Sequence, residues 1–434
     1  MTRPPRRATV PGLPGLAGLA LVCALGLTAC TDDGAGEEER PDAAPGRAPA
    51  PVALDVADLD GPVRVGVLVS TAGAPGEGSD LALPAHGAIV AERRLDAGGA
   101  DVELVVADDR GDADEARRAV AELAEAGVVG VVAATTGTHL AAALDDAAAL
   151  DVPVLLPYAE DAAGLSAGAW STAPSASAVD AGVAAALRSA GSTAPLVVAG
   201  AGARTPTVPG ARTVTLGTAG TGAAVDAVEQ AVADGADAVV VAAPAQAQGE
   251  VVAGVQAVDD LPLVLTPHAL RPAFTTALTD AGGATNGDLR TVGPDAGDTT
   301  TLAAGEEGDR AAAYFAALRQ AADDPDQQDL LGTGPFAARA GDADLASHDA
   351  VVALVRAAEE AGSTAAGDVV AALDGLALDG GSGLAGPPLV FDDAEALDDA
   401  DVHVLVGTTQ DPGVRPRPVD PAVRLAWFAV PVDG

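Results

Sequence analysis

Short apolar segments alternate with helix-like segments from residue 63 onward, and this alternation constrains the fold more than any other feature. A strand is expected at Val63–Val69, and a helix over residues 83–97 follows, with Pro84 near its first turn. Further strands are expected at residues 102–107, 128–134 and 153–156, with helices at about 114–126 and 138–150 between them. Strands that are apolar throughout are typical of a parallel sheet covered by helices on both faces.

The same rhythm restarts after a seam near residue 173. Helices are expected at about residues 176–189, 223–233, 249–258 and 272–279, and strands at 195–199, 212–216, 236–243 and 261–265. Later helices at about 306–322, 347–361 and 366–373 and strands at 388–391 and 402–406 could complete either half. The predicted fold class is therefore α/β, with two consecutive three-layer lobes built on parallel sheets.

One crossover in the second half is unusually short. Only residues 200–211, rich in Gly, Pro and Thr, separate the expected strands at 195–199 and 212–216. Because a parallel crossover normally contains a helix, the second lobe is predicted to be trimmed at this point.

The first thirty residues have the layout of an export signal. Three arginines precede an apolar run from Ala8 to Gly26, which ends in Leu27-Thr28-Ala29-Cys30. This ending resembles a bacterial lipobox, which implies that Cys30 is lipidated and becomes the mature N-terminus. The alternative is an uncleaved membrane helix, which Pro11 and Pro14 weaken and in which Cys30 has no role. Residues 31–60 are expected to form a disordered acidic tether.

Charge and composition narrow the classes of partner. The chain carries 63 acidic residues against 23 Lys and Arg, a formal net charge of −40, so binding to nucleic acid is disfavoured. After residue 30 no apolar run of membrane-spanning length is free of charges or Gly/Pro breaks, so membrane contact is expected through the lipid alone. The histidines are far apart, and neither a metal site nor a cofactor is predicted.

Several segments resemble, in order and spacing, the type 1 solute-binding proteins that serve ABC importers of branched-chain amino acids and amides. They are Ser70-Thr71-Ala72-Gly73 after the first strand, Val105-Val106-Ala107-Asp108-Asp109, Ser171-Thr172-Ala173-Pro174-Ser175, His348-Asp349-Ala350-Val351 and Leu389-Val390-Phe391-Asp392. The resemblance implies two lobes joined by a hinge, with ligand between them. It also implies lobe 1 at residues 61–172 and about 291–391, lobe 2 at 173–290 and about 392–415, and a C-terminal tail at 416–434.

The loop Thr135-Thr136-Gly137-Thr138 is the first candidate for ligand binding. Hydroxyls and free backbone N–H groups at the start of a helix suit an anionic group, and the resemblance implies that Thr135, Thr136 and Thr138 contact a ligand carboxylate. The resemblance places Ser70 and Thr71 at the same cleft edge. The alternative for the threonine loop is an ordinary threonine N-cap.

Three further residues follow strand ends at the expected cleft. Tyr158 and Glu160 occupy positions that the resemblance assigns to ligand contact, and Glu160 could meet a ligand ammonium; a structural role for Tyr158 is the alternative. His268 stands near the point where amino-acid binders of this class often carry a carboxylate, which weakens an amino-acid assignment. The alternative for His268 is that it is an exposed loop histidine without a function.

An enzyme is the competing class. Gly164-Leu165-Ser166-Ala167-Gly168 matches the G-x-S-x-G nucleophile pattern, but that pattern requires a tight strand-to-helix turn. Here seven residues separate it from the preceding strand and no clear helix follows, so no enzymatic activity is predicted.

The prediction is therefore a lipid-anchored extracytoplasmic protein that captures a small polar ligand, amino-acid-like or carboxylate-bearing, for an ABC permease. The alternative is a sensor or scaffold lipoprotein on the same fold whose cleft no longer binds ligand. The trimmed second lobe and His268 favour that alternative.

Overall fold

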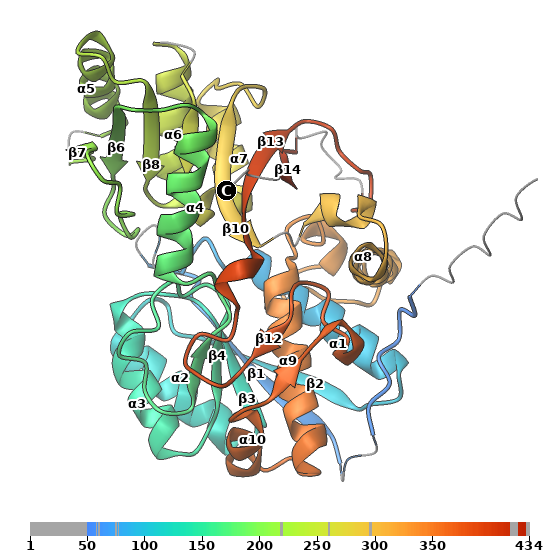
Figure 1. The fold of residues 1–434 in the computed structure, drawn as a ribbon. Coiled ribbons are helices and arrows are strands. Elements are labelled where there is room, and N and C mark those ends of the chain that lie inside the picture. Colours follow the sequence, from blue (N-terminus) through green and yellow to red (C-terminus); the bar gives the residue numbers. More distant parts are fainter. Residues whose placement is uncertain are drawn as a thin grey trace, which may run out of the picture. The chain divides into compact units, whose positions relative to one another are not determined.

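The computed structural model describes residues 50–57, 59, 61–73, 76, 78–217, 220–258, 261–294, 297–416 and 424–430. The expected signal peptide and Cys30 lie outside these residues. Pro49–Gly434 forms one compact unit, and within it two sheets define two lobes (Figure 1).

Lobe 1 contains a five-stranded parallel sheet in the order β2-β1-β3-β4-β5. The strands are β1 Val63–Val69, β2 Val102–Asp108, β3 Gly130–Ala134, β4 Val154–Leu156 and β5 Ala169–Ser171. The helices of this lobe are α1 Gly87–Ala97, α2 Ala113–Glu125, α3 Ala141–Ala149, α8 Glu306–Asp323, α9 Leu345–Ala361 and α10 Ala366–Leu373.

Alternate side chains of the lobe 1 strands enter two separate cores. Val65 and Val67 pack with α1, α8, α9 and α10 on one face, whereas Leu68 packs with α2 and α3 on the other. This period of two is that of an extended strand. Both faces are thus buried, which explains why the strands are apolar throughout.

Lobe 2 contains a seven-stranded sheet in the order β14-β13-β10-β9-β8-β6-β7. Its strands are β6 Pro195–Ala199, β7 Arg212–Thr215, β8 Ala238–Ala242, β9 Leu263–Leu265, β10 Leu289–Pro294, β13 Val402–Thr408 and β14 Ala426–Ala429. Helices α5 Thr221–Ala233, α6 Ala245–Gln256 and α7 Pro272–Asp280 share a core with one face. Helix α4 Ala176–Ser189 packs on the other.

The α/β class with helices on both sides of parallel-rich sheets is confirmed. The parallel arrangement is incomplete, however, because β13 pairs antiparallel with both β10 and β14. A small antiparallel pair, β11 Ala377–Leu378 and β12 Leu389–Val390, was expected only in part. Strands β5, β10 and β14 were not predicted, since β5 and β14 are short and 289–294 mixes Arg, Thr, Gly and Pro.

Two expected boundaries are corrected by the packing. The expected tether, residues 31–60, is too long: Leu54 is buried in the core of lobe 1, and its N–H donates to the Arg94 carbonyl. At the other end, part of the expected tail 416–434 is β14, paired with β13. Isolated apolar residues in a polar stretch contribute to a core only where a partner surface exists, which the local pattern does not reveal.

The short crossover between β6 and β7 is confirmed: its described residues, 200–211, contain no helix. The two strands are nevertheless parallel neighbours. Arg204 holds the loop against α4, with Nη1 donating to Asp180 Oδ1 at 2.7 Å and Nη2 to the Ala176 carbonyl at 2.9 Å. Helix α4 therefore supplies the packing surface that a crossover helix would otherwise provide.

Three crossovers connect the lobes. The chain passes from β5 into α4, from β10 toward α8, and from β12 to β13. Ser171 forms a bridge with Glu395, and the Ser175 hydroxyl donates to Asp399 Oδ1; these contacts join the first crossover to the third.

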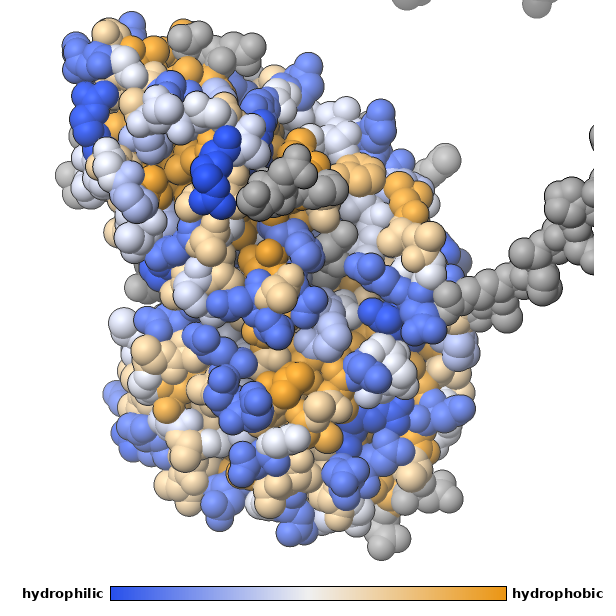
Figure 2. Space-filling model, viewed as in Figure 1, coloured by the Kyte–Doolittle hydropathy of each residue, from blue (hydrophilic) through white to orange (hydrophobic). Residues whose placement is uncertain are grey.

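Hydrophilic residues occur over both lobes in Figure 2, interspersed with apolar ones. Within the described part of the chain, no helix combines the length and apolar character that crossing a membrane requires.

Glu92 on α1 makes the stability of lobe 1 depend on pH. Burial raises its pKa from 4.5 to about 7. The folded state therefore holds this proton more tightly than the unfolded chain does. The stabilisation is complete below the unfolded pKa and is lost as pH rises through the folded value. We expect Glu92→Gln to increase the free energy of unfolding by about 1–3 kcal/mol near pH 8 relative to wild type.

Urea unfolding at several pH values between about 5 and 8 measures this effect. Glu122→Gln, at an exposed position of α2, is the matched control and should leave the pH profile unchanged. A wild-type profile parallel to that of Glu92→Gln would contradict the assignment.

Candidate functional site

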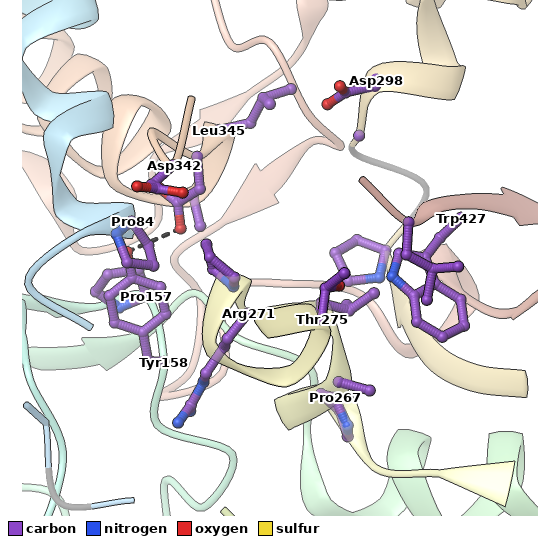
Figure 3. Close-up of a pocket in the computed structure, with 18 of the residues that line it drawn as sticks. Pro84, Pro157, Tyr158, Pro267, Arg271, Thr275, Asp298, Asp342, Leu345 and Trp427 are labelled. Carbon is purple, nitrogen blue, oxygen red and sulfur yellow. Dashed lines mark hydrogen bonds between the residues drawn. The ribbon is translucent and has the colours of Figure 1, made fainter. Parts of the chain in front are cut away.

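A cavity of about 740 Å³ lies between the lobes. Lobe 1 lines it with the ends of β4 and β5 and the start of α9, and lobe 2 with α7 and β14. In Figure 3, Arg271 and Thr275 belong to the α7 side, whereas Pro84, Pro157 and Tyr158 belong to lobe 1. Among the eight predicted ligand contacts, only Tyr158 and Glu160 line this cavity.

Ser70 and Thr135 are buried in a polar network instead. Both residues are 0 % exposed. The Ser70 hydroxyl donates to Asp109 Oδ1 and lies 2.6 Å from the Thr135 hydroxyl. Asp109 Oδ2 lies 3.1 Å from Nε2 of His139. The two predicted hydroxyls are therefore already satisfied by protein groups.

Two glycines in the segment after β1 bring the chain over this network. Gly78 has φ +104°, and a Cβ there would lie 2.2 Å from Thr135 Oγ1. A Cβ on Gly76 would lie 2.2 Å from the carbonyl oxygen of Gly202 in lobe 2. Only glycine permits approaches this close. The cleft edge next to Ser70 and Thr135 is thus closed by direct contact between the lobes.

The other predicted threonines lie outside the cavity. Thr71 is exposed, and its N–H donates to Asp108 Oδ1 at 2.9 Å. Thr136 is half-buried and Thr138 is exposed. The helical turn that begins at Thr138 is capped by Gly137, without a side-chain cap, so the alternative of a threonine N-cap is not seen either.

Tyr158 fixes the start of α9. Its hydroxyl donates to Asp344 Oδ2 at 2.8 Å, and Oδ1 of Asp344 accepts from the Ser347 N–H as the N-cap of the helix. Burial raises the pKa of Tyr158 well above its usual value and also raises that of Asp344. Tyr158 therefore both lines the cavity and has the structural role given as its alternative.

Glu160 and His268 meet across the lobes. The carboxylate of Glu160 lies 3.8 Å from His268 Nε2 and 3.8 Å from Arg204 Nε. Burial lowers the pKa of His268 far below its usual value, and the nearby Arg271 lowers it further. The imidazole is therefore neutral near pH 7, and its contact with Glu160 is not an ion pair. At 6 % exposure, His268 is not the exposed loop residue of the alternative interpretation.

A second contact between the lobes is a buried salt bridge. Arg271 Nη1, at the start of α7, lies 2.8 Å from Asp80 Oδ2 in lobe 1, and the two side chains are 10 % and 13 % exposed. We call this pair the interlobe latch. Breaking a buried ion pair leaves an uncompensated charge, which is strongly destabilising, so the latch favours the closed arrangement of the lobes.

Sequence reasoning missed every charged residue at the cavity except Glu160, among them Asp298, Asp342, Arg415 and Arg424. Arg415 Nε lies 2.7 Å from Asp298 Oδ1, and its Nη1 donates to the Ala343 carbonyl at 2.6 Å. Arg424 Nη2 donates to the Gly341 carbonyl at 2.6 Å. Trp427 on β14 also lines the cavity. Its type, one of two tryptophans in the chain, was the only available signal.

The G-x-S-x-G segment has no nucleophile geometry. Ser166 donates to Asp145 Oδ1 at 2.6 Å, and the segment precedes β5 rather than joining a strand to a helix. Among the described residues, no group of His, Cys, Asp and Glu is arranged to hold a metal ion. The cavity therefore presents groups suited to non-covalent binding.

Solved structures with the same architecture include three bacterial proteins. The first is the branched-chain amino-acid transporter substrate-binding protein LivJ of Streptococcus pneumoniae in complex with isoleucine. Its sequence identity to this chain is 17%, the match covers 85% of this chain and 99% of that chain, and the TM-score is 0.61. An ABC transporter substrate-binding protein of Desulfitobacterium hafniense in complex with Leu has 16% identity, coverage of 85% and 100%, and TM-score 0.58. A type 1 periplasmic binding protein of Bordetella pertussis has 16% identity, the same coverage and TM-score 0.58.

No protein-family model and no curated protein sequence matches the chain. The likeness therefore rests on the arrangement of the two lobes and covers almost the full length of each solved neighbour. By this architecture, the chain has the fold of the type 1 periplasmic binding proteins.

Proposed function

We propose that this protein is an extracytoplasmic solute-binding protein that captures a small molecule between its lobes and presents it to an ABC permease. The observation that carries the proposal is the cavity of about 740 Å³ to which both lobes contribute. Its volume lies within the range of small-molecule sites, about 300–1,000 Å³. A cavity shared by two hinged lobes couples ligand binding to closure.

The solved neighbours support this role. LivJ of S. pneumoniae holds isoleucine and the D. hafniense protein holds leucine. In the present chain the hydroxyls of Ser70 and Thr135, both expected to contact ligand, lie within hydrogen-bond distance of each other, and Ser70 also donates to Asp109. The ligand is therefore held by the groups that line the cavity, which are largely apolar residues with charged side chains among them.

We further propose that Cys30 carries a lipid that holds the protein on the outer face of the cell membrane. The proposal rests on the order of basic residues, apolar run and small residues before Cys30. Stable anchoring requires about two acyl chains or an equivalent second signal, which a diacylglyceryl group on the cysteine provides.

A bulky side chain in the cavity should abolish binding. Thr275 on α7 lines the cavity, and its hydroxyl forms no hydrogen bond with the described residues, so Thr275→Trp is expected to fill space without breaking a hydrogen bond. In a thermal-shift screen of polar and apolar metabolites, a ligand at one hundred times its Kd should stabilise wild type by about 2.7 kcal/mol. Thr275→Trp should reduce the shift to the level without ligand.

Thr213→Trp, at an exposed position of the edge strand β7, is the matched control and should keep the full shift. If Thr275→Trp and Thr213→Trp both keep it, the ligand binds elsewhere and this cavity is not the site.

Removing the cysteine should release the protein from the membrane. In cells that express the full chain, we expect wild type in the membrane fraction and in the detergent phase of a detergent–water partition. Cys30→Ala should move to the aqueous phase, whereas Cys23→Ala should stay with the membrane. Equal partition of wild type and Cys30→Ala into the detergent phase would show that Cys30 is not the anchor.

The second candidate is a sensor or scaffold whose cleft does not open and close. The interlobe latch is the observation that favours it. The Asp80–Arg271 pair and the contact of Gly76 with Gly202 hold the lobes together through protein atoms alone. In this case the closed form exists without ligand and offers a constant surface to a protein partner.

Opening the latch distinguishes the two candidates. Spin labels at exposed Ala141 and Thr213, in a chain whose Cys23 and Cys30 are replaced by alanine, report the distance between the lobes. We expect Asp80→Asn to lengthen or broaden this distance and the double exchange Asp80→Arg with Arg271→Asp to restore it. A scaffold requires in addition that no compound in the screen changes the wild-type distance.

A further inference from the structure

Two carboxylates at the cavity have acceptor atoms that no group in the described part of the chain fills. Oδ2 of Asp298 is buried without a hydrogen-bond partner, and the side chain is 10 % exposed. The carboxylate of Asp342 has neither a hydrogen bond nor an ion pair among the described residues, and it is only half-buried. Buried polar atoms are nearly always paired, so the unfilled Oδ2 of Asp298 is unusual. The half-buried carboxylate of Asp342 is accessible to a donor on a bound molecule.

The two carboxylates lie close to one guanidinium. Arg415 bonds Asp298 through Nε and the carbonyls of Gly341 and Ala343 through Nη1, on either side of Asp342. The Arg415 guanidinium also lies 5.1 Å from the centre of the Phe315 ring. These contacts hold Arg415 in place, and Arg415 in turn fixes the position of Asp298 relative to the backbone around Asp342.

The arginines at the cavity are largely engaged by protein groups. Arg271 is paired with Asp80, Arg415 with Asp298, and Arg424 donates to the Gly341 carbonyl. The cavity is lined by six acidic residues against these three arginines: Glu160, Asp280, Asp298, Asp342, Asp344 and Asp349. This excess of negative charge opposes an anionic ligand and attracts a cation.

The rest of the wall is apolar. Leu345 and Ala338 lie beside Asp342 along the chain, and several prolines line the remaining surface. Trp427 stands across the cavity from Asp342 in Figure 3 and contributes an indole ring. Such a wall suits a hydrocarbon body, and an indole face also attracts a cation.

We propose that the cavity binds an organic amine, a small cation with an apolar body, whose ammonium group donates hydrogen bonds to the carboxylate of Asp342, while Asp298, which lines the same cavity, adds negative charge. An ammonium has three donors and no acceptor, which matches a carboxylate whose oxygens are filled by no group in the described part of the chain. Burial raises the pKa of Asp342, and Arg424 and Arg415 oppose this effect; a bound ammonium would favour the charged carboxylate further. This inference rests on the proposed solute-binding function.

The test compares matched probes of different charge on the purified full chain. Hexylamine and benzylamine are the cationic probes, hexanoate and benzoate the anionic ones, and hexanol the neutral one. We expect the amines to raise the melting temperature and to bind in titration calorimetry, and the acids to bind at least tenfold more weakly. The same titrations at raised salt exclude adsorption to the acidic surface, because exposed charges are screened more strongly than buried ones.

Neutralising Asp342 should weaken amine binding specifically. Asp342→Asn is nearly isosteric and removes no hydrogen bond in the described part of the chain, so the fold should be retained. We expect a loss of affinity for hexylamine of about ten- to hundredfold and little change for hexanol. Asp298→Asn should act in the same direction, and Asp392→Asn, at an exposed position outside the cavity, should leave binding unchanged.

The outcomes separate this inference from the function on which it rests. If hexanoate or hexanol binds as tightly as hexylamine, or Asp342→Asn binds hexylamine like wild type, the amine assignment is overturned while solute binding stands. If neither these probes nor any compound of the metabolite screen binds, solute binding itself is wrong and the amine assignment is wrong with it.

Discussion

Both lobes depend on strands that are buried on their two faces at once. In β1, Val65 and Val67 enter one core and Leu68 the other, and in β8, Val239 and Val240 divide in the same way. Both faces of such a sheet must be covered, because burying apolar surface is favourable by about 25 cal/mol per Å² and either face, if uncovered, would expose that surface to water. The helices are thereby confined to the faces of the sheets. The strand ends, their loops and the parts of the helices next to them remain available to meet the other lobe.

The position of the cavity follows from how those loops meet. Near the ends of β1 and β3 the loop edge is occupied by the chain itself, with Gly78 against Thr135 and Gly76 against Gly202. The open volume lies instead beside α7, the start of α9 and β14. The interlobe latch, Asp80 with Arg271, borders both regions. This buried ion pair thus lies next to both the internally satisfied polar network and the open cavity.

The charges around the cavity divide into those that hold the fold and those left for a ligand. Arg415 joins Asp298 and the backbone before α9, so its charge is used within the protein. Asp342 has no such partner among the described residues, and burial raises its pKa. A charge that costs free energy to bury and has no structural partner is typical of a binding site.

Sequence alone determined the alternation of strands and helices, the two halves, and the missing crossover helix between β6 and β7, because local apolar period and turn residues encode these features. It also placed Tyr158 and Glu160 at the cavity, since both follow directly on a strand end. Tertiary structure decided the rest. Leu54, Arg415 and Trp427 lie in segments without a regular pattern, and their roles arise from contacts with residues distant in the chain, such as Asp298 for Arg415 and Thr299 for Trp427. Ser70 and Thr135 have the residue types of a binding loop, but their hydroxyls bond each other and Ser70 donates to the buried Asp109 carboxylate, while Gly78 lies directly against them. These contacts form only in the folded chain, so no ligand is needed to satisfy the two hydroxyls.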